Sequence, residues 1–122
     1  KPIYDDYELA LMFRQNQDVK YLIYVLLQRP NMTLFEQTKG MIREYSLEMY
    51  LMVYVECLKE YINQGTRNYY LSDYIYDLFH DLDEMSKLEL VDMLKKEYPR
   101  RKKLHEMLDA CLKEGDEIEI QY

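Results

Sequence analysis

Apolar side chains recur along this chain at the spacing of α-helices. Between residues 71 and 85 they follow one another at intervals of four and three residues, at Leu71, Ile75, Leu78, Leu82 and Met85. This spacing places them on one face of a helix. The same periodicity predicts helices over about 6–15, 19–28, 33–64, 73–84, 86–97 and 99–114. The helix over 33–64 is long for a small domain, and Gly40 or Ser46 is expected to bend or divide it.

Local signals mark the ends of several of these helices. The segments 33–36 and 86–89 each have a Ser or Thr followed three residues later by Glu. This is the pattern of a capping box, in which the two side chains satisfy free backbone amides at a helix start. Gly65 and Gly115 are predicted to end the helices that precede them.

The most apolar stretch of the chain runs from Tyr45 to Leu58 and contains only three polar residues, Ser46, Glu48 and Glu56. It is shorter than the ~20 residues that cross a bilayer. We therefore expect a buried central helix here, and no membrane anchor.

The last seven residues, 116–122, alternate between polar and apolar side chains. This period of two predicts a short extended strand or tail after the helices. An unpaired strand seeks a partner, so two copies of the chain are predicted to pair through Ile118 and Ile120 as a homodimer. Addition to a partner's sheet and a disordered tail are the alternatives.

Composition agrees with a helical chain. Nearly half of the 122 residues are apolar, and only three Gly and three Pro interrupt them. A β-rich protein of this length would need more turn residues. The sequence therefore predicts one all-α domain over residues 1–122, a compact bundle of five or six helices. Its two cysteines, Cys57 and Cys111, are expected to be reduced core residues, which favours a cytoplasmic setting.

Neither histidine is accompanied by a complete catalytic or metal-binding set. Asp77 and His80 have the spacing of a carboxylate–histidine metal helix, but no matching pair follows elsewhere. His105 and Asp109 supply two ligands of one helix face without a third. Twelve residues separate Arg67 from His80, more than the ribonuclease motif of HEPN domains allows. We expect no enzymatic activity, cofactor or metal, with a HEPN-like ribonuclease as the least favoured alternative.

The charges are the most distinctive pattern, in a chain whose net charge is −7. Residues 72–94 carry seven acids and one base, whereas residues 95–103 carry six bases and one acid. The acids proposed to share one helix face are Asp73, Asp77, Asp81 and Glu84, and the basic cluster consists of Lys95, Lys96, Arg100, Arg101, Lys102 and Lys103. The basic cluster either neutralises the acidic stripe within the molecule or binds an acidic or phosphate-bearing partner.

These observations favour a small regulator, inhibitor or immunity-type protein that binds a protein partner. The 14 tyrosines and eight methionines suit a contact surface, and the acidic stripe suits a basic partner. The negative net charge opposes general binding to nucleic acid or to an anionic membrane. The alternative is a dimeric nucleic-acid-binding regulator that uses the cluster at 95–103.

Overall fold

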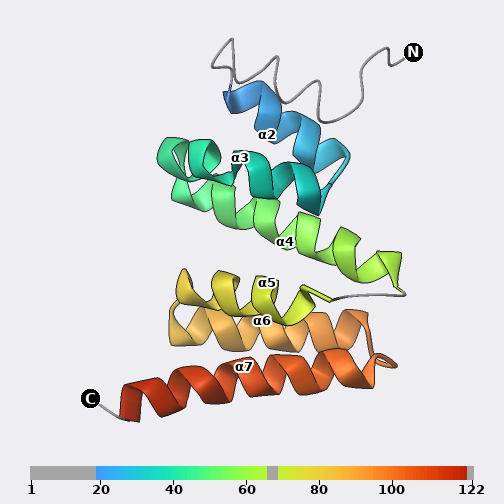
Figure 1. Cartoon of the computed structure of the whole chain (residues 1–122), viewed down its shortest axis with the longest axis vertical. Coiled ribbons are helices and arrows are strands. Elements are labelled where there is room, and N and C mark those ends of the chain that lie inside the picture. The colour runs from blue at the N-terminus through green and yellow to red at the C-terminus, as the bar shows by residue number, and fades with distance from the viewer. Residues whose placement is uncertain (1–18, 66–68, 121–122) are drawn as a thin grey trace. The chain divides into compact units, whose positions relative to one another are not determined.

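The structure is a computed structural model that describes residues 19–65 and 69–120, with side chains up to residue 114 (Figure 1). Over these ranges it contains six α-helices and no strand, which confirms the all-α bundle. The helix expected at 6–15 lies outside the described residues. The chain divides into two compact units, residues 1–68 and 69–122. A single domain over 1–122 stays a prediction, and each unit is described by itself.

The first unit contains α2 (Val19–Gln28), α3 (Met32–Tyr45) and α4 (Leu47–Gln64). The three helices pack against one another, and their apolar faces form the core because each presents a stripe at helical spacing. At its centre Phe35 is fully buried, with its ring centroid 5.0 Å from that of Tyr54 and 5.7 Å from that of Tyr50. The guanidinium of Arg43 lies 5.1 Å from the centroid of the Tyr50 ring.

A single residue, Ser46, separates α3 from α4. Its backbone is extended, its amide donates to the carbonyl of Ile42, and its carbonyl accepts from the amide of Tyr50. Its Oγ accepts from the amide of Met49 at 3.1 Å and so caps α4. The predicted long helix over 33–64 is therefore divided at Ser46. Gly40 lies within α3, and Gly65 ends α4 with a positive φ of 84°, as predicted.

The expectation that the whole Tyr45–Leu58 stretch is buried is wrong. Val53, Tyr54, Cys57 and Leu58 are buried on one face of α4, but Tyr45, Leu47 and Met52 are about half exposed. A helix turns its side chains through all directions, and α2 and α3 cover only part of its circumference. The apolar composition of a run therefore does not make it buried all round.

The second unit contains α5 (Leu71–His80), α6 (Glu84–Glu97) and α7 (Lys102–Ile120). Helix α7 packs against both α5 and α6. The buried residues are Leu71, Ile75, Leu78, Phe79, Leu90, Val91, Leu94, Leu104, Leu108 and Cys111. Within the ranges that the structure describes, no helix has both the length and the apolar content that crossing a membrane requires.

Neither predicted capping box forms. The side chain of Asn31 accepts from the amide of Leu34 at 2.9 Å, and α3 starts at Met32, before Thr33. The carboxylate of Asp83 accepts from the amide of Ser86 at 2.8 Å, and α6 starts at Glu84. In both places an earlier Asn or Asp captures the free amide, which is the preferred chemistry of a helix start.

The C-terminal segment also differs from its prediction. The backbone of α7 continues as helix through Gly115 to Ile120, where the alternating pattern predicts an extended strand or tail over 116–122; residues 121–122 of that prediction lie outside the described part of the chain. A helix pairs the backbone amides of this segment with carbonyls of the preceding turn, whereas a lone strand has no partner strand among the described residues. The strand-mediated homodimer stays a prediction without this structural basis.

Candidate interaction surfaces

One face of α5 carries acidic and tyrosine side chains together. Four residues at intervals of three, one and three positions share one helix face: Tyr70, Asp73, Tyr74 and Asp77. Both aspartates are exposed, Tyr70 is 60% exposed, and the rings of Tyr70 and Tyr74 are 6.3 Å apart at their centroids. We call these four residues the acid–tyrosine face.

The predicted acidic stripe does not lie on a single helix. Helix α5 ends at His80, so Asp81 caps its C-terminal end and Glu84 begins α6. The interruption follows from Asp83, whose side chain starts the next helix. The amide of Ser86 is also the main reason that the pKa of Asp83 is lowered. Glu84 is engaged with Lys87 at 3.0 Å, so Asp73 and Asp77 remain as the acids of the α5 face.

Two residues of the basic cluster form ion pairs within the second unit. Lys95 of α6 contacts Asp109 of α7 at 2.8 Å, and Lys96 contacts Asp92 one turn earlier at 3.0 Å. Intramolecular neutralisation therefore occurs for these two lysines, but with acids other than those of the predicted stripe.

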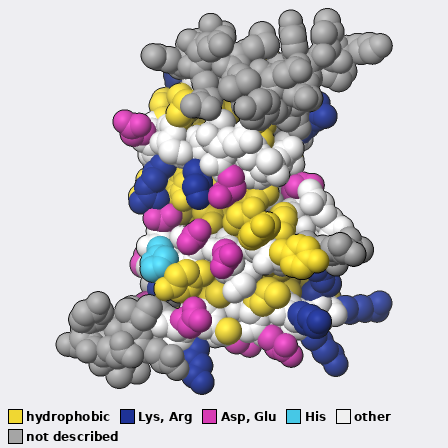
Figure 2. Space-filling view, in the orientation of Figure 1, with side chains coloured by type: hydrophobic (Ala, Val, Ile, Leu, Met, Phe, Trp, Pro, Cys, Tyr) yellow, Lys and Arg dark blue, Asp and Glu magenta, His cyan; other side chains and the backbone are white. Residues whose placement is uncertain are grey.

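The rest of the basic cluster lies at the turn between α6 and α7. Arg100, Lys102 and Lys103 are exposed, and Arg101 is partly buried, with its carbonyl accepting from the amide of His105. Dark blue side chains gather at this end of the second unit in Figure 2. Cations at the start of α7 oppose the helix dipole, so the dipole does not account for their position there.

The histidines have ordinary structural surroundings. His80 is exposed, and its ring meets the ring of Tyr76 edge-on at 4.6 Å. Nε2 of His105 lies 2.8 Å from the carbonyl oxygen of Tyr98, and Asp109 pairs with Lys95 instead of joining His105 in a site. Among the described residues, no three His, Cys, Asp or Glu side chains are grouped to hold a metal. The absence of enzymatic activity and of a metal stays a prediction.

Both cysteines are free and buried. Burial raises the pKa of the Cys57 thiol to about 12, and it raises the pKa of Cys111 as well. The thiolate is the reactive form of cysteine, so these environments keep both thiols unreactive near neutral pH.

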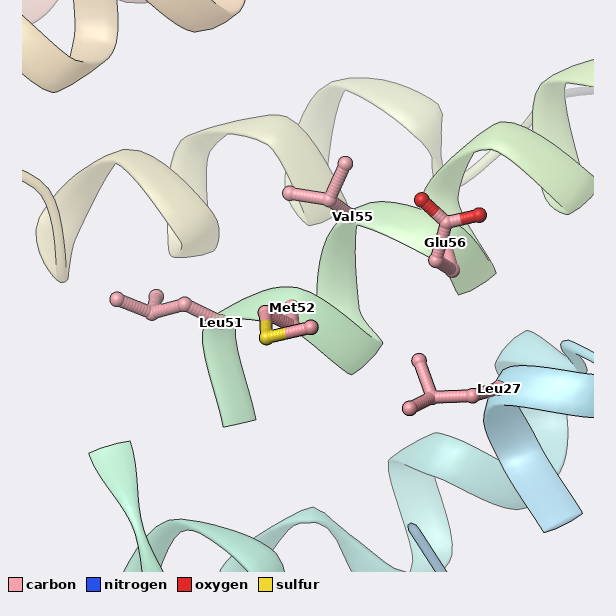
Figure 3. A pocket seen from close by; sticks show the side chains of 5 residues that line it. All are labelled: Leu27, Leu51, Met52, Val55 and Glu56. Carbon is pink, nitrogen blue, oxygen red and sulfur yellow. The ribbon is translucent and has the colours of Figure 1, made fainter. Parts of the chain in front are cut away.

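Sequence reasoning missed an open apolar groove between α2 and α4. It is lined by Leu27 of α2 and by Leu51, Met52, Val55 and Glu56 of α4, and its volume is about 510 Å³ (Figure 3). In Figure 3 the Leu27 side chain extends from α2 toward the part of α4 that carries Met52 and Glu56. The sequence does contain a sign that this side of α4 is open. Residues spaced by four lie on one side of a helix, and here they are Glu48, Met52 and Glu56. Two acids on one side argue against a helix that is buried all round.

No protein-family model, curated protein or solved structure matches this chain.

Proposed function

We propose that this chain is a non-enzymatic protein-interaction module that binds a basic segment of a partner protein through the acid–tyrosine face of α5. It acts on that partner as a small regulator, inhibitor or immunity-type protein. The observation that carries the proposal is the placement of two exposed carboxylates and two tyrosines on one face of a short helix.

The chemistry of this face suits arginine. A carboxylate accepts two parallel hydrogen bonds from a guanidinium, and a tyrosine ring attracts a cation that lies over its face. Asp73 and Asp77 stand one helical turn apart and are both exposed, so each is accessible to a separate basic side chain. Tyrosine and arginine are enriched among the few residues that contribute most of the binding energy at protein–protein interfaces.

Photo-crosslinking from a residue of this face tests the proposal. A photoreactive amino acid is placed at Tyr70, and the chain is irradiated in extracts of its native host. We expect a discrete protein adduct whose crosslinked peptide is rich in Arg or Lys. The matched control places the same group at Glu89, which is exposed on α6 of the same unit.

Substitution of the carboxylates then measures their part in the complex. Asp73→Asn with Asp77→Asn should weaken binding of the captured partner about tenfold, because two charge-assisted contacts are lost. Glu89→Gln should leave the affinity unchanged. Equal adducts from both crosslinking positions, or full affinity of the double variant, would contradict the proposal. A regulator or inhibitor should also change the activity of its partner on addition.

A second candidate function is nucleic-acid binding, and the exposed Arg100, Lys102 and Lys103 favour it. Binding of this kind would weaken steeply as salt rises, because phosphate contacts release counterions. The net charge of −7 opposes it. A salt titration of the chain with a mixed-sequence duplex, repeated with all three residues changed to Gln, distinguishes this candidate from protein binding.

The cytoplasmic setting belongs to the same proposal. It is supported by two free, buried cysteines in a chain whose apolar core does not need a disulfide.

A further inference from the structure

We propose that the groove between α2 and α4 is a docking site for an amphipathic helix of a partner protein, one that carries Lys or Arg beside its apolar stripe. This inference concerns the first unit alone and does not depend on the acid–tyrosine face of α5. The groove is open, and four of its five lining residues are apolar. Met52 is 48% exposed within it, and methionine is a flexible side chain that adapts to different apolar contacts.

The shape of the groove suits a helix. Leu51, Met52 and Val55 contribute apolar atoms over one turn of α4, and the Leu27 side chain extends from α2 toward the part of α4 that carries Met52 (Figure 3). A helix that lies in such a groove inserts side chains spaced by three, four and seven residues. The apolar side chains that line this groove can contact such a row of apolar side chains, and they require no hydrogen-bond partners.

The acidic side chains of α4 beside the groove favour a basic partner. Glu48, Met52, Glu56 and Glu60 follow one another at intervals of four, so the acids continue the Met52 row along α4. Glu48 is exposed, and the side chain of Glu56 is 46% exposed. One cation, Lys59, lies near Glu56 at 3.9 Å, which is long for an ion pair. On the α4 wall of the groove, among the described residues, these three acids accompany one base, and this wall therefore favours a positively charged occupant.

Two other occupants fit the charge less well. Residues 1–18, which lie outside the described part of the chain, contain apolar side chains but also four acids, Asp5, Asp6, Glu8 and Asp18, against Lys1 and Arg14. A second copy of the chain carries a net charge of −7. Like charges across an interface oppose association, so a basic partner helix is the better match.

A pair of synthetic helical peptides tests the inference. The first carries Leu at positions one, four and eight and Lys on both flanks, and the second replaces each Lys by Glu. Binding is followed by nuclear magnetic resonance of ¹³C-labelled methionine methyl groups, with the Met52 signal assigned from Met52→Leu. We expect the Lys peptide to shift the Met52 signal and the Glu peptide to leave it unchanged. Met85, which is 69% exposed in the second unit, serves as the internal reference.

Variants then separate specific docking from general attraction to an acidic protein. Glu48→Gln with Glu56→Gln should weaken binding of the Lys peptide about fivefold, since two exposed charge contacts are lost. Glu44→Gln, at an exposed site on α3, should not change the affinity for the Lys peptide. The double variant with Asp73→Asn and Asp77→Asn should not change it either. Circular dichroism checks that each variant keeps its helical content.

Four results would overturn the inference. These are an unchanged Met52 signal, equal responses of Met52 and Met85, full affinity of the Glu48/Glu56 double variant, and equal binding of a peptide with Ser in place of Leu. A Met52 signal that shifts with protein concentration in the absence of peptide would assign the groove to a second copy instead. Because the Glu48/Glu56 double variant leaves α5 unchanged and the Asp73/Asp77 double variant leaves α4 unchanged, failure of this inference is distinct from failure of the proposed function.

Discussion

Replacement of Phe35 by Ala tests how the first unit is held together. The Phe35 side chain is fully buried, and its ring contacts the rings of Tyr50 and Tyr54 on α4. Removal of the ring loses the free energy of burying it and leaves a cavity between α3 and α4, which together cost about 3–5 kcal/mol for a buried Phe. The two ring contacts place the expected loss toward the upper part of this range.

The loss is measured by urea unfolding followed by circular dichroism. Phe35→Leu keeps most of the apolar volume and should cost less, so it provides a measurable variant if Phe35→Ala does not fold. Gln37→Ala, at an exposed position of the same helix, should change the free energy of unfolding by less than about 0.5 kcal/mol. If Phe35→Ala costs no more than this control, the aromatic cluster is not the centre of the core. Coincident unfolding of both units would support the predicted single domain.

Three further predictions concern single residues. Ser46→Ala should lower the free energy of unfolding by about 0.5–2 kcal/mol, because α4 loses its capping oxygen; a thermal melt that matches the parent would contradict this role. Gly65→Ala should cost about 1–2 kcal/mol, because its φ of 84° disfavours a side chain, and chemical denaturation measures it. Cys57 should resist a thiol reagent at pH 8 in the folded protein and react after unfolding, and rapid labelling of the native chain would show that it is accessible. Because its pKa is about 12 when folded and near 9 when unfolded, the unfolded thiol ionises first, so its contribution to stability is constant below pH 9 and falls as pH rises toward 12.

Helical periodicity predicted the elements better than their ends. The stripe through Leu71, Ile75 and Leu78 is the buried face of α5, and the division at Ser46 was one of two sites anticipated. The helix starts were missed because Asn31 and Asp83 capture the first free amides before Thr33 and Ser86 are reached. Such competition between neighbouring caps is decided by backbone geometry, which a spacing rule does not contain.

The candidate surfaces were predicted in part. Asp73 and Asp77 share an exposed face as expected, but the end of α5 at His80 separates them from Glu84. The groove was missed because a run of apolar residues was equated with burial, whereas exposure depends on which neighbouring helices cover each side. The partners of Lys95 and Lys96 also depend on tertiary packing, since Asp109 reaches Lys95 from another helix.

The single-residue link at Ser46, between α3 and α4, restricts where residues can be inserted into this chain. Its amide, carbonyl and hydroxyl oxygen are all engaged by residues of the two flanking helices. One inserted residue would lengthen this extended link by about 3.3–3.6 Å, so α4 could not keep both its packing against α3 and the hydrogen bonds made at Ser46. Insertions at this link should therefore be excluded among natural or engineered variants, whereas substitutions that retain a capping side chain should be accepted.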